Sequence, residues 1–296
     1  MIFYAVLMMV LYSNIVSSTD MEDPEDHHEK IAYGFPVREL DLYPYFVSIQ
    51  KEDRTKPSGY AHHCGGSLIT RKIVLTAAHC LHDPMLVPTY RILPNYRNSP
   101  FIQDGDLTFL ISQYVMHPNY NATRIYIAND IAVILMDQPD PRHGATIRLP
   151  TFQIMAYCEP VTIIGFGLTE DGVFPNELRS AVVYRLTDEI CLGLNFDGSY
   201  IQGSNLCTAN VIKSGICTAD SGGPLIRTVN NISYVQGVAI SSYHPCGSDY
   251  ISNFVNVFEY LAFINHAILL LNRDELRSNQ SSTFDGLKLI KVRPME

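Results

Sequence analysis

The sequence of 296 residues contains no tryptophan, few charged residues and no excess of basic ones. Its formal net charge is −9, which argues against a nucleic-acid partner because phosphate recognition needs a basic face. Much of this charge lies in residues 19–30, TDMEDPEDHHEK, which carry six acidic groups and one lysine. The rest of the chain is close to balanced and predicts a soluble surface.

Long apolar runs are also scarce. After the N-terminal apolar segment, the best candidate for a membrane span is Ala262–Leu271. It is short and interrupted by polar residues, so no membrane partner is expected. Met1–Val16 is almost wholly apolar yet short for a membrane span, and small residues follow it. This pattern predicts a secretory signal at 1–18 and a secreted, extracellular protein, with a membrane anchor as the alternative.

The middle of the chain lacks amphipathic helices that alternate with strands, which argues against a parallel sheet. Its short apolar runs, rich in Val, Ile, Tyr and Phe, are typical of strands in an all-β sandwich or barrel. One helix is expected at about Glu259–Asn272, and residues 273–296 read as a polar tail. The expected strands are Tyr45–Gln50, Ser67–Leu75, Leu107–Met116, Ile131–Met136, Val161–Phe166, Ala181–Leu186, Pro224–Thr228, Tyr234–Ile240 and Phe254–Phe258.

Secretion makes the seven cysteines candidates for disulfides, and their odd number leaves at least one unpaired or linked to another chain. Three triplets have the form of N-glycosylation sites. They begin at Asn121, Asn231 and Asn279. We therefore expect a disulfide-bonded glycoprotein.

Three short segments carry a possible chemistry: LTAAHC at 75–80, NDIAV at 129–133 and CTADSGGPL at 217–225. They supply His79, Asp130 and Ser221. A serine hydroxyl needs a base within reach and the base needs an orienting group, which a histidine and an aspartate provide. Singly, each residue has a structural interpretation, as a buried histidine, a turn aspartate or a loop serine. The three segments in this order are far more specific.

Together these segments resemble the signatures of the chymotrypsin-like (trypsin-type) serine proteases, and residues 178–225 look most like insect digestive or collagenase-like chymotrypsins. The resemblance covers about residues 31–272 and implies one protease domain there. It implies two packed six-stranded antiparallel β-barrels with a C-terminal α-helix and an active site between the barrels. It also implies a monomer without cofactor or metal that cleaves protein or peptide substrates and meets protein protease inhibitors.

The resemblance assigns roles to single residues. His79 is the expected general base, Asp130 its orienting group and Ser221 the nucleophile. The backbone N–H groups of Ala219 and Ser221 are the expected oxyanion hole. A trypsin-like activating protease is expected to cut after Lys30, which makes residues 19–30 an acidic propeptide.

That cut frees the amine of Ile31, which the resemblance pairs with the carboxylate of Asp220. The specificity pocket is expected to have Gly215 at its base, Ile216 as an apolar wall and Ser242 and Ser252 along its sides. An uncharged, narrow pocket favours small to medium apolar residues over Lys or Arg, because an unpaired cation is costly to bury. Asp249 on the same loop would change this prediction if it turned inward.

The same resemblance implies three disulfides: Cys64–Cys80, Cys191–Cys207 and Cys217–Cys246. Cys158 has no partner in this scheme, and we expect a buried thiol rather than a link to another chain. A competing interpretation is a zinc site, which lacks the paired spacing of structural zinc motifs. Its ligands would come from His62, His63, Cys64, His79 and Cys80.

The chain departs from the family pattern at several positions. Ala219 replaces the oxyanion-hole glycine, and a positive φ there would cost about 1–2 kcal/mol. Ile240 stands where a serine usually supports the triad aspartate, although a shift of one residue would place Ser241 there. Tyr33 replaces a glycine beside the activation site, and Phe166 and Phe263 stand where the family commonly has tryptophan.

Two classes of function remain. An active endopeptidase accounts for all three segments and for the activation site. A non-catalytic homologue would be a secreted binding or regulatory protein, but such relatives usually lose a triad residue, and none is lost here. A lectin or structural β-domain leaves the three segments without a role.

Overall fold

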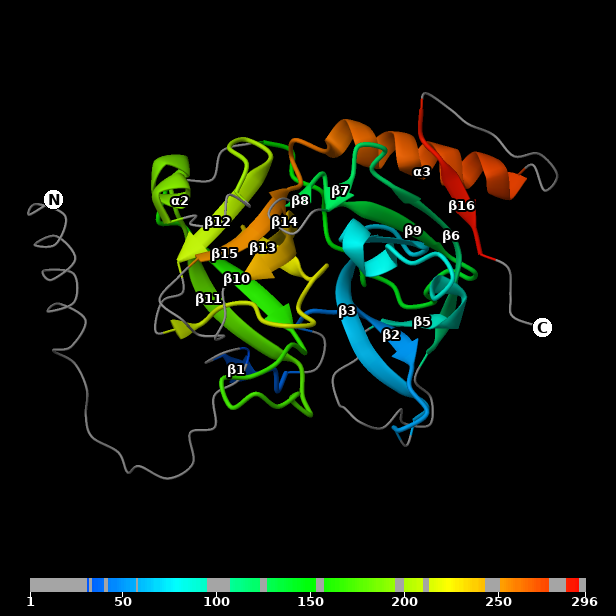
Figure 1. Cartoon of the computed structure of the whole chain (residues 1–296), viewed down its shortest axis with the longest axis horizontal. Helices are drawn as coiled ribbons and strands as arrows, with labels where there is room; N and C mark the ends of the chain where they lie inside the picture. Colours follow the sequence, from blue (N-terminus) through cyan, green and yellow to red (C-terminus); the bar gives the residue numbers. More distant parts are fainter. Residues whose placement is uncertain are drawn as a thin grey trace, which may run out of the picture.

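Strands dominate the chain and form two closed antiparallel barrels that lie side by side (Figure 1). The fold class expected from the sequence is confirmed. The expected signal and propeptide, 1–18 and 19–30, lie outside the described residues. The computed structural model describes residues 31, 34–39, 42–56, 58–94, 107–122, 127–152, 157–194, 200–209, 213–242, 251–276 and 286–292.

The first barrel closes because its two end strands also pair with each other. Its strands pair in the order β6-β5-β2-β3-β4-β9, and β9 pairs again with β6. The bounds are β2 (Phe46–Glu52), β3 (Tyr60–Leu68), β4 (Ile73–Thr76), β5 (Tyr90–Pro94), β6 (Phe109–Met116) and β9 (Ala132–Met136).

The second barrel closes in the same way. Its strands pair in the order β11-β10-β13-β14-β15-β12, β12 pairs again with β11, and the short β1 (Phe35–Pro36) is added outside β11. The bounds are β10 (Pro160–Gly165), β11 (Arg179–Arg185), β12 (Asn205–Ala209), β13 (Pro224–Val229), β14 (Ile232–Ser242) and β15 (Ile251–Asn256). A separate two-stranded ladder joins β7 (Asn121–Ala122) to β8 (Ile127–Ala128).

Side-chain alternation explains why these segments form barrel walls. In β11, Ala181 and Val183 are buried inside the barrel, whereas Val182 and Tyr184 are exposed. Successive side chains of a strand point to opposite faces, so every second apolar residue enters the core. β9 is buried along its whole length because it also contacts the C-terminal helix.

Several expected boundaries were wrong. The apolar run 67–75 is not one strand, because a turn at residues 69–72 separates the end of β3 from β4. Phe254–Phe258 was placed too far along, since β15 ends at Asn256. The short strands β5 and β12 and the helix α2 (Asp188–Leu194) were missed.

The C-terminal helix α3 (Leu261–Leu276) starts two residues later and ends four residues later than expected. It lies along the first barrel, in contact with β9 and β6. Ile264, Ala267 and Leu271 are fully buried in that contact. No helix in the described part of the chain has the length and apolar character needed to cross a membrane.

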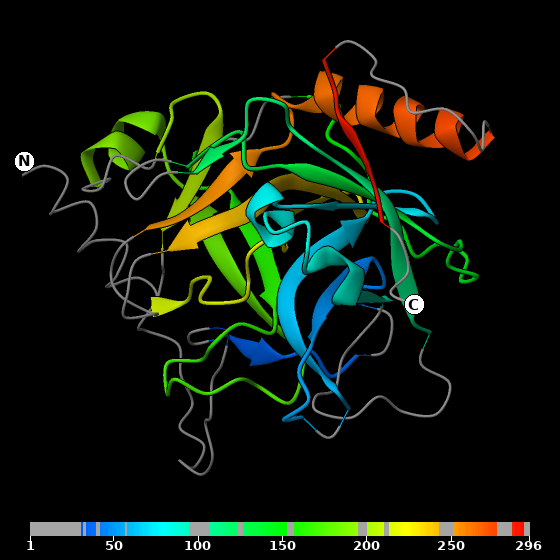
Figure 2. The ribbon, with the colours of Figure 1, turned by 45° about the vertical axis from the view of Figure 1, so that its right-hand side comes forward.

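Part of the segment expected to be a tail packs on the first barrel. Strand β16 (Leu289–Lys291) pairs antiparallel with β6, and Leu287 is only 5% exposed within the apolar core. Figure 2 shows α3 along the top of this barrel, with β16 descending beside β6. Residues 286–292 therefore belong to the folded domain.

Leu287→Ala tests this packing. Truncating a buried leucine should lower the free energy of unfolding by about 2–3 kcal/mol, because a cavity replaces apolar contacts. Denaturant unfolding of the purified precursor provides the measurement. The matched control is Leu269→Ala on α3, where the leucine is 56% exposed, and it should change stability by less than about 0.5 kcal/mol. Equal small effects would contradict the packing of β16.

Candidate active site

His79 is held by a short 3-10 turn, η1 (Ala78–Leu81), that follows β4 almost directly. The next residue, Cys80, forms a disulfide with Cys64 on β3, which ties this turn to the barrel wall. The zinc interpretation is therefore wrong, because both sulfur atoms that it needs are joined to each other. His63, another of its ligands, instead donates from Nε2 to the carbonyl of Cys80 at 3.3 Å.

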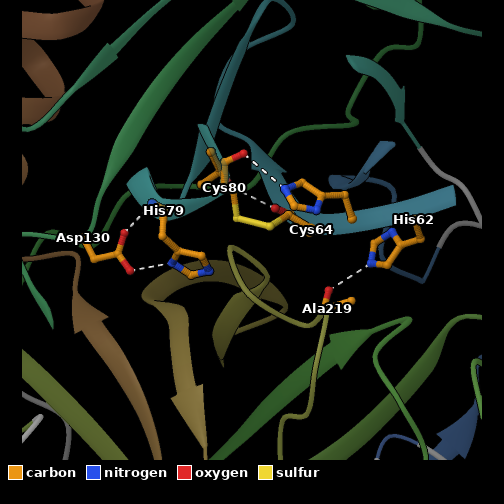
Figure 3. Close-up of a disulfide and its surroundings, with 9 residues drawn as sticks. His62, Cys64, His79, Cys80, Asp130 and Ala219 are labelled. Atoms are coloured by element: carbon orange, nitrogen blue, oxygen red, sulfur yellow. Dashed lines mark hydrogen bonds and ion pairs between the residues drawn. A yellow bond between two sulfur atoms is a disulfide. The ribbon is translucent and has the colours of Figure 1, made fainter. Parts of the chain in front are cut away.

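Two hydrogen bonds join His79 to Asp130 (Figure 3). The ring Nδ1–H donates to Asp130 Oδ2 at 2.6 Å, and the backbone N–H of His79 donates to Oδ1 at 2.8 Å. Asp130 is 1% exposed. The residue before it, Asn129, accepts a hydrogen bond from the hydroxyl of Tyr260, which directly precedes α3. The carboxylate thereby holds both the tautomer and the orientation of the imidazole.

The pKa of His79 is raised above its ordinary value. Burial by itself lowers the pKa, but the charge of Asp130 and the hydrogen bond to it outweigh burial. The side chain keeps 29% of its surface exposed. Such a histidine can accept and release a proton near neutral pH.

Ser221 lies in the turn before β13, where the second barrel touches the first. Its carbonyl accepts a hydrogen bond from the N–H of Gly65 on β3 at 2.8 Å. The next residue, Gly222, has φ +80°, and a Cβ there would overlap the hydroxyl of Thr76 and the carbonyl of Gly65. Since Thr76 is three residues before His79, this contact brings Ser221 into the neighbourhood of the imidazole.

The side chain of Ser221 forms no hydrogen bond with any described residue, His79 included. In enzymes without substrate, catalytic hydrogen bonds are often long or poorly aligned. The backbone N–H groups of Ala219 and Ser221 likewise have no acceptor in the described part of the chain. Two unpaired donors beside a serine hydroxyl can bind a developing negative charge.

A histidine whose importance the sequence analysis missed supports this turn. His62 donates from Nε2 to the carbonyl of Ala219 at 3.0 Å (Figure 3). Its Nδ1 accepts a hydrogen bond from Ser48 Oγ at 2.7 Å. Burial lowers the pKa of His62 to about 4, so the ring is neutral. No local pattern indicates the link, because Ala219 is 157 residues away along the chain.

The backbone at Ala219 has φ +76°, which L-residues with a side chain rarely adopt. The alanine thus occupies a conformation suited to glycine. Phe166 is one of the two residues expected in place of tryptophan. Its side chain is buried, and its ring centre lies 5.5 Å from that of His62. The other, Phe263, is 8% exposed on α3.

Within the described part of the chain, Asp220 is a buried carboxylate that accepts hydrogen bonds from backbone donors alone. The N–H groups of Gly167 and Cys217 donate to its two oxygens at 2.7 and 2.8 Å. Burial raises the pKa of Asp220 to about 7, although these two bonds lower it. Side chains at Gly165 or Gly167 would overlap the carboxylate, so both positions require glycine. No cation neutralises Asp220 among the described residues.

The expected pocket residues are partly assembled. Gly215 and Ile216 are buried, and the N–H of Ile216 donates to Ser252 Oγ at 3.3 Å. Ser252 is fully buried on β15, and Ser242 ends β14. Ile240 is 5% exposed. Five residues singled out from the sequence lie outside the described residues: Lys30, Tyr33, Cys246, Asp249 and Asn279.

Two of the expected disulfides, Cys64–Cys80 and Cys191–Cys207, are present. Cys217 is also disulfide-bonded. The expectation that Cys158 is a buried thiol was wrong, since it is free and exposed at a turn with φ +58°. A turn preceding β10 lies at the barrel surface, which the apolar character of cysteine does not reveal.

Asn121 and Asn231 are both exposed, as a glycan would require.

Ala219→Gly should stabilise the protein. Glycine adopts φ +76° without a Cβ penalty, so the free energy of unfolding should rise by about 1 kcal/mol. The matched control is Ala262→Gly, at an exposed position in the first turn of α3, which should instead lower it by up to about 1 kcal/mol. Denaturant unfolding measures both variants. A loss of stability in both would show that Ala219 is not strained.

Comparisons with known proteins agree with this geometry. The family model described as Trypsin matches residues 33–264. Chymotrypsin-like elastase family member 1 from Bos taurus is 28% identical over 273 residues, which covers 88% of this chain and 98% of that protein. The protein of the same name from Canis lupus familiaris is 29% identical over 276 residues, covering 88% and 99%. The chain therefore belongs to the trypsin family of chymotrypsin-like serine proteases.

Proposed function

We propose that the protein is a secreted serine endopeptidase made as an inactive precursor. The observation that carries this proposal is the pair of hydrogen bonds between His79 and Asp130. The contact between Gly65 and Ser221 brings the serine turn of the second barrel to this pair. The similarity to elastase family members supports a protein or peptide substrate. A signal at 1–18 and glycans at Asn121, Asn231 and Asn279 belong to the same proposal.

In the proposed reaction, neutral His79 takes the proton of Ser221 as the hydroxyl attacks the scissile carbonyl. Asp130 holds the Nδ1–H and stabilises the imidazolium that forms. The N–H groups of Ala219 and Ser221 bind the oxyanion, and His79 then protonates the leaving amine. Water removes the acyl group by the same steps in reverse order. Because the pKa of His79 is raised, the basic form is lost as the pH falls through that value.

Activation is proposed to follow a cut after Lys30 by a trypsin-like protease. The new amine of Ile31 would pair with Asp220, whose buried carboxylate accepts two backbone N–H groups from the described residues. The side chain of Ile31 is 1% exposed among the apolar residues of the second barrel, which supports a position close to this site. A cation there would lower the pKa of Asp220 and satisfy a buried charge that is otherwise costly.

A fluorophosphonate probe tests the proposed function. Trypsin-treated precursor should label at Ser221, and Ser221→Ala should abolish labelling and nearly all turnover. Lys30→Gln should prevent activation, whereas Lys56→Gln, at an exposed turn, should not. Labelling is read by mass spectrometry, with the N-terminus sequenced alongside.

Full labelling of the uncut 19–296 chain would refute the proposal that the protein is made as an inactive precursor. A correctly cut chain that does not label would favour the second candidate, a non-catalytic homologue that acts as a secreted binding protein. The positive φ of alanine at position 219 is the observation that favours this candidate.

The proposed specificity is for small to medium apolar residues before the scissile bond. Gly215 supplies no charge at the pocket base, and Ser252 occupies space along its side. In a panel of peptide anilides, Ala, Val or Leu should be preferred over Phe, with Arg and Lys poorest. Preferences of a hydrophobic pocket are modest, about 1–3 kcal/mol per methylene.

The matched variant is Gly215→Asp, which puts a carboxylate at the pocket base and should raise cleavage after Arg and Lys. A wild-type preference for Arg or Lys would end this proposal, and a preference for Phe would require a wider pocket.

A further inference from the structure

A cavity of about 440 Å³ lies on one face of the hairpin formed by β13 and β14, in the second barrel. Val229 and Ile232 are opposite each other beside the turn, and Arg227 pairs with Tyr234 two residues further along. Side chains two residues apart on a strand share a face, and these four line the cavity together. The hairpin therefore contributes a continuous wall that begins at its turn.

The cavity is largely apolar, and its charge is compensated among the described lining residues. Phe152, which lines it from the segment before β10, is 62% exposed, and Val229 is 37% exposed. Arg227 is the one charged group in the described lining, and its Nε donates to the carboxylate of Glu159 at 2.6 Å. Apolar surface exposed to water gains free energy when a ligand covers it. The cavity therefore suits a neutral ligand with apolar faces.

One buried polar side chain opens into the cavity. Gln236 is 4% exposed, lines the cavity and forms no side-chain hydrogen bond with any described residue. Its amide atoms are nevertheless not sealed from solvent. This amide has donors and an acceptor without a protein partner, and a ligand that carries an amide of its own can satisfy both. A neutral ligand with an amide group therefore fits better than a hydrocarbon.

The turn at the end of the cavity carries one of the N-glycosylation triplets, which begins at Asn231. Asn230 and Ile232, on either side of Asn231, both line the cavity. Asn230 has φ +50° and Asn231 has φ +61°, and a type I′ hairpin turn requires positive φ at both central residues. Asn231 is exposed, and its side chain forms no hydrogen bond with a described residue. A group attached to Asn231 therefore starts at the rim.

An N-linked glycan matches this cavity in its chemistry. Its first two sugars are N-acetylglucosamines, which are neutral, have apolar C–H faces and each carry an acetamide. The C–H faces pack on apolar and aromatic side chains such as Val229 and Tyr234, and an acetamide can pair with the amide of Gln236.

The glycan also matches the cavity in length and attachment. Ile232 and Gln236 are four residues apart, about 13 Å along the strand. Two linked sugars and the asparagine side chain that holds them span this distance. Attachment at the rim gives the sugars a high effective concentration over the cavity. The same attachment obstructs a protein partner, so the glycan is the favoured occupant.

We propose that the glycan on Asn231 lies in this cavity, with its first sugar against Val229 and Ile232 and its second beside Phe152 and Gln236. The glycan covers exposed apolar surface and stabilises the turn between β13 and β14. This packing rests on the glycosylation of Asn231 that belongs to the proposed function and on no catalytic step, so the uncut precursor is the form to test.

Thermal unfolding of the precursor secreted from eukaryotic cells measures the stabilisation. Asn231→Asp removes the glycan and keeps a residue that tolerates positive φ, and it should lower Tm by about 2–4 °C. The matched control is Asn121→Asp, which removes a glycan and adds the same charge at another exposed position. It should leave Tm unchanged. Mass spectrometry of the wild-type chain establishes that both sites carry a glycan.

Phe152→Ser separates packing in the cavity from mere attachment. Combined with Phe152→Ser, the loss of Tm on Asn231→Asp should fall to less than about half, because the glycan and the phenyl ring are then no longer coupled. The matched control is Phe174→Ser, at a phenylalanine that is 53% exposed outside the described lining of the cavity. In that background the loss on Asn231→Asp should be unchanged.

Packing should also protect the glycan from enzymes. For the native chain with high-mannose glycans, an endoglycosidase that cuts between the first two sugars should act about tenfold more slowly at Asn231 than at Asn121. Denaturation should make the two rates equal. Phe152→Ser should reduce the difference in the native chain, and Phe174→Ser should not.

Each possible failure has a separate meaning. Equal Tm for wild type and Asn231→Asp, an undiminished loss in Phe152→Ser, or equal release at the two sites would each overturn the packing of the glycan. An unmodified Asn231 in the secreted chain would refute both the glycan and its packing. A chain with a packed glycan that never labels with fluorophosphonate after trypsin treatment would refute the endopeptidase alone.

Discussion

One contact between the barrels determines the arrangement of the site. The N–H of Gly65 on the first barrel donates to the carbonyl of Ser221 on the second, and Gly222 packs against Thr76 with no room for a side chain. This contact places the turn containing Ser221 beside the turn containing His79. Glycine is needed because two backbones approach each other more closely than any Cβ permits. The disulfide Cys64–Cys80 and the bond from His62 to Ala219 stabilise the two sides of the same contact.

Two buried carboxylates near this contact have different environments. Asp130 faces an imidazole whose pKa it raises, so its charge is compensated within the folded chain. Among the residues that the structure describes, Asp220 receives only two backbone N–H groups, and burial raises its own pKa to about 7. Burying a carboxylate disfavours its charged form unless a partner stabilises that form. The difference between the two residues is the physical basis for proposing one as part of the reaction and the other as part of activation.

The C-terminal segment extends the first barrel instead of trailing from it. β16 pairs with β6 where β6 has moved away from β5, and Leu287 enters the core beneath it. The composition of this region is polar overall, which is why the sequence predicts a tail despite a few apolar residues. Pairing with β6 buries those few residues and leaves the lysines at the surface.

The sequence by itself determined the all-β class and the approximate position of many strands, because alternation is a local feature. The two barrels were implied only by the resemblance of the three signature segments to a known family. The sequence also determined that Ala219 replaces a glycine, and the backbone does have the positive φ anticipated for that position. Tertiary structure alone decided the rest. The link from Ser48 through His62 to Ala219, the exposure of Cys158 and the strand β16 depend on partners distant in the chain. Local patterns carry no information on such partners, since burial and hydrogen bonding are set when the two barrels close and pack together.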